Sequence, residues 1–185
     1  MIIFENNTLK LEFFISGMLQ NNSYLLISKT TNNSIIIDIP DNPIELINAT
    51  PKNKLQKSKN IDTIQAIITH GHYDHIEGID FAKDRLGDIN ISIGLEDAKY
   101  LNYAGKVTKL KKLNKIINKD LELEIIYTPG HTAGSICFYL EIDENKFLFT
   151  GDTLFPGGPG KTVDSKSFNK IYNSITKNIY SLANE

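Results

Sequence analysis

The sequence predicts one domain in which β-strands alternate with short helices. The chain has 185 residues, 41% of them hydrophobic and 23% charged, which suits a single globular domain with its own core. Short runs rich in Ile, Leu, Tyr and Phe are separated by polar turns, and a few segments have helical spacing instead. We therefore expect one mixed domain over residues 1–185, without internal repeats.

The first elements expected are a buried hairpin and a short helix. Residues 24–27 and 34–38 have the composition of two strands joined by a polar turn. The second is apolar almost throughout, as expected for a strand that is buried on both faces. Between residues 40 and 60, three prolines and a run rich in Lys and Asn predict a helix near residues 44–47 and then a mobile loop.

A buried strand over residues 64–69 follows and ends abruptly in a polar string that begins at His70. Residues 79–86 have helical spacing and stop at a glycine that can cap the helix. We expect a strand over residues 89–93 and another short helix over residues 95–103. Polar loops at the ends of strands are where mixed folds place their chemistry.

Residues 107–117 alternate Lys with Leu and Ile, which favours an amphipathic edge segment over a basic binding stripe. Three further strands are expected at residues 121–127, 135–141 and 147–150, the last two forming a hairpin. The chain closes with an amphipathic helix, capped by Asp164 or Ser165. Its apolar face, which we expect in the core, consists of Phe168, Ile171, Tyr172, Ile175, Ile179 and Leu182.

The composition excludes several classes of function. A net charge of -2 does not provide the clustered basic residues of a nucleic-acid-binding surface. The apolar runs are far shorter than the ~20 residues that cross a membrane. The N-terminus lacks the basic and apolar regions of a secretion signal, so we expect a cytoplasmic protein with no membrane partner. A single cysteine, Cys137, excludes an internal disulfide.

Three of the four histidines fall within one loop, in the string THGHYDH at residues 69–75. In an extended loop His70 and His72 project to the same side, while Asp74 and His75 occupy the turn that follows. Imidazole and carboxylate groups bind zinc and similar divalent metals. Because scattered surface or core histidines would not cluster in this way, the loop predicts a metal site.

The fourth histidine and one more aspartate lie in turns of the same kind. His131 follows a predicted strand in a turn rich in Pro and Gly, where it can complete a three-histidine site. Asp152 follows the apolar strand expected over residues 147–150, in a Gly-Asp turn. An isolated aspartate there is typical of a backbone cap, but next to five candidate ligands we interpret it as a bridging carboxylate.

These strings have the order and spacing of a known family. THGHYDHIEG at residues 69–78, TPGHTAGS at residues 128–135 and TGDTLF at residues 150–155 resemble the metallo-β-lactamase superfamily, and most of all its glyoxalase II-like branch. Asp38 matches an early aspartate with a structural role beside the metal loop. The resemblance extends from Asn22 onward and implies an α+β fold, a four-layer αββα sandwich with metals at one edge between the sheets.

The resemblance also implies a role for each residue. His70, His72 and His131 would bind a first metal, Asp74 and His75 a second, and Asp152 would bridge both. Two cations ~3.5 to 4 Å apart need such a shared anion, and they lower the pKa of a bridging water toward about 7. The resulting metal-bound hydroxide would be the nucleophile, oriented by Asp74 as the catalytic carboxylate. Zinc suits these ligands, with manganese and iron as alternatives.

One departure from the family affects the number of metals expected. Members of this branch carry a further histidine after the bridging aspartate, in a Gly-His-Gly turn, as the last ligand of the second metal. No histidine follows His131 in this chain. We therefore expect either a truncated C-terminus or a protein without that ligand, and single-metal occupancy becomes an alternative to two divalent ions.

The expected function is metal-dependent hydrolysis of a small-molecule thioester or ester. By resemblance, a hydroxyacylglutathione-type thioester is the leading substrate, and residues 153–162 are expected to border the substrate cleft, with Lys161 available to an anionic group. A mononuclear iron persulfide dioxygenase is one alternative, and a non-catalytic metal-binding module is another. The sequence carries no indication of the oligomeric state.

Overall fold

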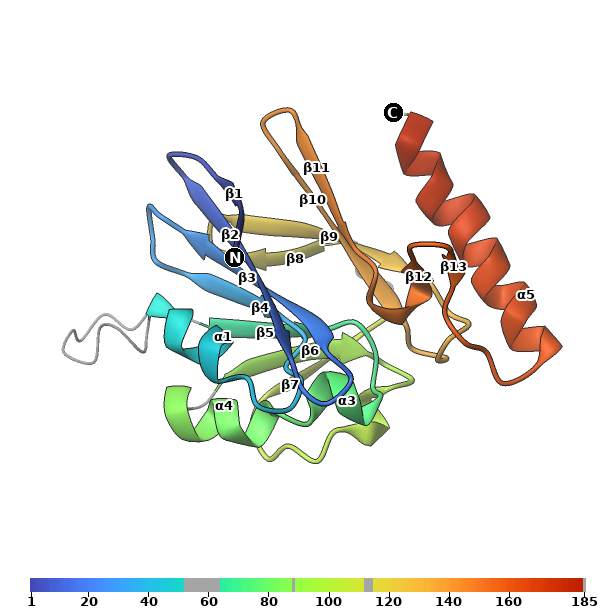
Figure 1. Ribbon diagram of the computed structural model, residues 1–185, viewed down its shortest axis with the longest axis horizontal. Helices are drawn as coiled ribbons and strands as arrows, with labels where there is room; N and C mark the ends of the chain where they lie inside the picture. The colour runs from blue at the N-terminus through green and yellow to red at the C-terminus, as the bar shows by residue number, and fades with distance from the viewer. Residues whose placement is uncertain (52–63, 88, 112–114, 185) are drawn as a thin grey trace.

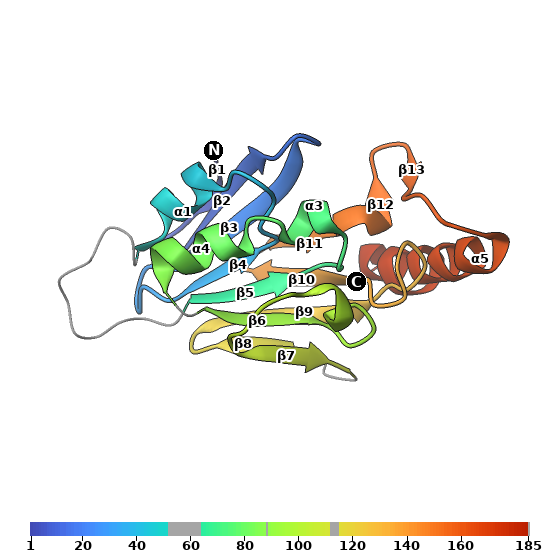
Figure 2. The same ribbon diagram turned by 90° about the horizontal axis from the view of Figure 1, so that it is seen from below.

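The computed structural model describes residues 1–51, 64–87, 89–111 and 115–184. They form two β-sheets that pack against each other, with helices on both outer sides (Figures 1 and 2). This order of layers confirms the αββα sandwich. Most of the loop expected up to residue 60 lies outside the described residues.

The first sheet, in the described part of the chain, has seven strands in the order β1-β2-β3-β4-β5-β6-β7. They are β1 (Ile2–Glu5), β2 (Leu9–Ser16), β3 (Asn21–Ser28), β4 (Ser34–Ile37), β5 (Ile64–Ile68), β6 (Asn90–Gly94) and β7 (Val107–Leu110). Neighbours from β1 to β4 pair antiparallel, and neighbours from β4 to β7 pair parallel. Every residue of β4 is buried, which confirms the hairpin and its buried second strand.

The second sheet is antiparallel, with the order β11-β10-β9-β8 among the described residues. Its strands are β8 (Lys115–Asn118), β9 (Leu121–Tyr127), β10 (Ile136–Ile142) and β11 (Asn145–Phe149). The strands expected over 121–127, 135–141 and 147–150 are thereby confirmed within one or two residues. A short hairpin of β12 (Leu154–Phe155) and β13 (Gly158–Pro159) follows.

Among the described residues, three apolar clusters hold the four layers together. The largest lies between the sheets and includes Leu26, Ile35 and Phe138, which are fully buried. A second packs α1 (Ile44–Ala49) and α4 (Ile79–Leu86) onto the outer face of the first sheet. Burial of each large aliphatic or aromatic side chain contributes about 1.5–3 kcal/mol, so these clusters stabilise the sandwich. Among the described residues, no helix combines the length and apolar character needed to cross a membrane.

The third cluster packs the C-terminal helix onto the second sheet. This helix is α5 (Ser165–Ser174), which continues as η3 (Ile175–Ile179) and η4 (Tyr180–Asn184). Ile171, Ile175 and Ile179 are buried against Cys137, and burial raises the pKa of that thiol to about 11. Cys137 is therefore a core residue. The side chain of Asp164 accepts a hydrogen bond from the Ser167 amide, confirming the expected cap.

The aromatic residues of this helix are not in the core, contrary to the expectation from the sequence. Phe168 is 48% exposed and Tyr172 58%. The helix lies on a sheet on one side only, so a narrow stripe at i, i+4 and i+8 is enough to bury its contact face. The aromatic side chains flank that stripe and face outward.

Of two other expectations, the one for residues 95–103 is wrong and the one for residues 107–117 is confirmed. Residues 95–103 do not form a helix of that length, because only η1 (Ala98–Tyr100) has helical geometry, as a short 3-10 turn. The amphipathic segment 107–117 does form edge strands, but β7 belongs to the first sheet and β8 to the second. The alternating pattern fits an edge strand in either sheet, and it carries no information about where the chain changes sheets.

One carboxylate ties the turn before β9 to the turn after β3. Asp120 accepts hydrogen bonds of 2.5, 2.5 and 2.7 Å from the hydroxyl groups of Ser28, Thr30 and Thr31. Partial burial raises the pKa of Asp120, but the three hydroxyl groups outweigh it and lower this pKa to about 2.

We predict that Asp120→Asn lowers the free energy of unfolding by about 1 kcal/mol at pH 7. The effect is small because water screens the interactions of this partly exposed carboxylate. Because the folded-state pKa lies below the unfolded value of ~3.9, this stabilisation is complete above about pH 4 and is lost as the pH falls toward about 2. Urea unfolding of the wild type and the variant at pH 7 and pH 3 measures it. An equal difference at both pH values would contradict the assigned role.

Candidate metal centre

Several strand ends meet at one edge of the sandwich. In the first sheet β4, β5 and β6 are parallel, so their carboxyl ends lie at the same edge. In the second sheet β9 and β11 both pair antiparallel with β10 and therefore run in the same direction. The residues that follow these five strands are Asp38, His70, Asp97, His131 and Asp152. The topology thus places residues far apart in the sequence beside one another.

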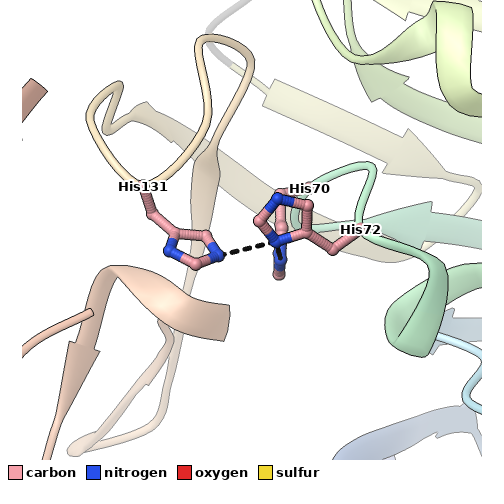
Figure 3. Close-up of side chains that lie close together, drawn as sticks. All are labelled: His70, His72 and His131. Atoms are coloured by element: carbon pink, nitrogen blue, oxygen red, sulfur yellow. Dashed lines mark hydrogen bonds between the residues drawn. The ribbon is translucent and has the colours of Figure 1, made fainter. Parts of the chain in front are cut away.

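Three histidines form the first cluster, defined as His70, His72 and His131. His72 Nδ1 lies 3.1 Å from His70 Nε2 and 2.8 Å from His131 Nε2, and Figure 3 shows the rings converging. The three ligand nitrogens all lie within 4.8 Å of one another. Two of these side chains come from the loop after β5 and the third from the loop between β9 and β10, so the site joins the two sheets.

A second cluster, His70, His75 and Asp152, adjoins the first and shares His70 with it. His75 belongs to α3 (Tyr73–Ile76). The carboxylate of Asp152 links this cluster to the first, because its Oδ1 is 3.2 Å from His75 Nε2 and its Oδ2 is 3.4 Å from His131 Nε2. Each oxygen of one carboxylate thus faces a different cluster.

Asp74 lies at the border of the second cluster. Its Oδ2 is 3.7 Å from His75 Nε2 and accepts a hydrogen bond of 2.8 Å from Asn21 Nδ2. The structure therefore brings together all six residues that the sequence predicted, with Asp74 beside the second cluster and not a member of either.

Hydrogen bonds outside the clusters orient the imidazole rings. The Thr69 hydroxyl donates to Asp38 Oδ2 over 2.7 Å, so its oxygen is free to accept from His70 Nδ1, 3.2 Å away. His131 Nδ1 donates to the carbonyl oxygen of Lys161 over 2.7 Å. In both histidines the proton is therefore on Nδ1, and the lone pair of Nε2 faces the first cluster.

The electrostatics keep two of these rings neutral. Burial and the neighbouring His75 hold the pKa of His70 far below its usual value. Burial and the neighbouring His131 lower the pKa of His72. Neutral imidazole is the form that binds metal ions, so these rings are held ready as ligands.

His75 supplies the test of whether the residues fit a metal. Its Nδ1 donates to Asp38 Oδ2 over 2.8 Å, whereas the buried Nε2 makes no well-oriented hydrogen bond among the described residues, although Asp152 Oδ1 lies 3.2 Å away. Burial lowers the pKa of this ring, but Asp38 and Asp152 outweigh it and raise the pKa to about 10. A buried nitrogen without a well-oriented hydrogen bond is unfavourable, and a cation between His75 and Asp152 would satisfy both. The donor set of imidazole and carboxylate therefore fits a divalent metal site.

Two residues near the site were not predicted from the sequence. Asn21 holds Asp74, from which it is separated by 53 positions, so no local pattern could reveal it. Asp97 binds the loops that carry the histidines. Asp97 follows a buried strand, as His70 and His131 do, so its position in the sequence could have marked it as a site residue. Because residues 95–103 were expected to form a helix, Asp97 was not considered as part of a loop at the site.

A cavity of about 600 Å³ opens beside the second cluster. Asp74, His75 and Asp152 form one wall, and the aromatic side chains of Tyr24 and Phe149 contribute to the rest. Leu154, Phe155 and Pro156 also line it, which confirms that the loop after Asp152 borders a cleft. A cavity of this size is typical of a small-molecule site.

Comparison with known proteins agrees with this geometry. The profile described as Metallo-beta-lactamase superfamily matches residues 16–178, most of the chain. The chain belongs to this superfamily. A solved superfamily structure, a metallo-beta-lactamase from Staphylococcus aureus, superposes with a TM-score of 0.73 at 25% identity, covering 93% of this chain and 52% of that one.

Two curated relatives carry a more specific name. The hydroxyacylglutathione hydrolase of Pelagibacter ubique is 33% identical over 175 residues, and the cytoplasmic hydroxyacylglutathione hydrolase of Arabidopsis thaliana is 32% identical over 165 residues. These matches cover 90% and 88% of this chain. The chain spans only 65% and 60% of the lengths of these relatives.

We predict that Asp38→Asn lowers the free energy of unfolding by about 1–3 kcal/mol. The amide of Asn would turn its NH₂ group toward donors on Thr69 and His75 that now bind a carboxylate. Thermal unfolding of the metal-free protein measures the loss. The control is Asp41→Asn, which alters an exposed carboxylate three residues away and should change stability by less than about 0.5 kcal/mol. Equal effects of the two substitutions would contradict the assigned role of Asp38.

Proposed function

We propose that residues 1–185 act as one domain that hydrolyses a small-molecule thioester of the hydroxyacylglutathione type at a centre of two divalent metal ions. The observation that carries this proposal is the pair of adjoining clusters joined by the Asp152 carboxylate, at the wall of a cavity of about 600 Å³. The hydroxyacylglutathione hydrolase relatives support the reaction class.

Each of the six residues has a proposed place in the centre. His70, His72 and His131 would hold one ion, Asp74 and His75 the other, and Asp152 would contact both. Zinc is the proposed metal, because three imidazoles and a carboxylate suit it, and the same ligand set also suits manganese or iron. Two cations at such a centre lower the pKa of a water molecule and polarise a carbonyl group.

The side chains of the site divide the remaining chemistry. Asp74 Oδ2 is engaged by Asn21, so Oδ1 is the atom that would orient the attacking water and accept its proton. Asp38 and the Lys161 carbonyl keep the imidazoles of His75 and His131 in fixed orientations. A fixed ligand frame places the reacting atoms without reorganisation during the reaction.

The cavity supports a small acyl substrate. Its carboxylate and imidazole wall would face the scissile carbonyl, and its aromatic side, with Tyr24 and Phe149, would contact the apolar part of the substrate. The proposed partner is therefore a small molecule. A cytoplasmic location is proposed as well, supported by the name of the Arabidopsis relative. The hydrolase names of the relatives favour this reaction over a persulfide dioxygenase or a non-catalytic module.

We predict that His72→Ala lowers kcat/KM for hydroxyacylglutathione hydrolysis by at least about 100-fold. The Nδ1 atom of His72 contacts both other nitrogens of the first cluster, so its removal opens the ligand set. The assay follows thiol release with zinc in the buffer. Tyr73→Ala, which alters the adjacent, 64% exposed side chain, is the matched control and should keep its activity. Turnover that survives in His72→Ala would contradict the proposal.

A further inference from the structure

Asp97 is a buried carboxylate outside the proposed ligand set. It lies in the turn between β6 and η1 and is 1% exposed. Among the described residues no ion pair is formed with it, so its charge is compensated by hydrogen bonds. A buried carboxylate is costly unless its oxygens are satisfied in this way, which makes the identity of its donors informative.

The donors come from the two loops that carry the first cluster. Asp97 Oδ2 accepts from the Gly71 amide over 2.8 Å and from the Thr132 hydroxyl over 2.6 Å, and Oδ1 accepts from the Gly134 amide over 3.0 Å. Gly71 is the residue between His70 and His72, and Thr132 directly follows His131. One side chain from the turn after β6 thus binds both loops at positions adjacent to all three histidines.

Both glycines allow their loops to approach Asp97 closely. A Cβ added at Gly134 would lie 2.7 Å from the carboxyl carbon of Asp97, and one added at Gly71 would lie 3.1 Å from Asp97 Cβ. Either distance is too short for ordinary contact. The loops therefore approach Asp97 more closely than a residue with a Cβ at either position would allow.

We propose that Asp97 is a positioning residue that holds the loops of the first cluster at the separation a metal ion requires. This inference rests on the metal centre of the proposed function. The carboxylate fixes the loops before a metal binds, so the binding energy of the metal is not spent on ordering them. Residues that orient metal ligands from outside typically contribute 10–100-fold to metal affinity.

The experiment compares zinc affinities of metal-free proteins, measured by competition with a chelator. Asp97→Asn should weaken zinc binding about 10–100-fold. Thr132→Val, which removes one donor to Asp97, should weaken it about tenfold, whereas Thr132→Ser keeps the hydroxyl and should stay within about twofold of the wild type. The visible spectrum of bound Co²⁺ should change in Asp97→Asn, because it reports the arrangement of the ligands.

Asp120→Asn is the matched control. Asp120 also accepts three hydrogen bonds and ties two turns together, but it does so in the turns after β3 and before β9. Its loss should lower the melting temperature of the metal-free protein and leave the zinc affinity and the Co²⁺ spectrum unchanged. This comparison separates a general loss of stability from a loss of ligand positioning.

The outcomes distinguish this inference from the proposed function. A wild-type protein that binds no zinc overturns both. A wild-type protein that binds zinc, with unchanged affinity in Asp97→Asn and Thr132→Val, overturns the role of Asp97 alone. If Asp97→Asn does not fold, the comparison of Thr132→Val with Thr132→Ser decides the question, and equal affinities in that pair overturn the inference.

Discussion

The buried carboxylate of Asp38 is the contact on which the rest of the site depends. It accepts hydrogen bonds from the amide and hydroxyl groups of Thr69 and from His75 Nδ1, at 2.7 to 2.8 Å. Its backbone has a φ of 57°, a left-handed conformation that few residue types adopt readily. This one residue joins the end of β4 to the end of β5 and to α3. Through Thr69 it also determines which nitrogen of His70 faces the first cluster.

Two buried carboxylates, Asp38 and Asp97, bind the segments that carry the histidines without belonging to the proposed ligand set. Each follows a strand of the first sheet, and each accepts three hydrogen bonds from the loops that bear the ligands. The sheets supply the common edge, and the carboxylates fix the loops along it. The cluster geometry therefore depends on the strand order as well as on the histidines.

The sequence predicted which side chains gather at the site better than it predicted the residues that hold them in place. The ligand candidates occupy short strings with distinctive residue types after apolar strands, so local patterns were sufficient for all six. Asn21 and Asp97 act on partners 53 and 26 to 37 positions away, and contacts of that range appear only when the sheets are assembled. The outward position of Phe168 and Tyr172 was not predictable either. Periodicity defines the apolar face of a helix, but it does not show how much of that face the neighbouring sheet covers.

The metal content of the intact chain, purified without chelator and determined together with its mass, is the decisive test of the proposed centre. We expect about two divalent ions per chain, and about one in His75→Ala, which removes a ligand of the second ion only. About one ion in the wild type would contradict the assignment of Asp74, His75 and Asp152 to a second ion. The absence of metal from the wild type, even after addition of zinc, would contradict the metal centre itself.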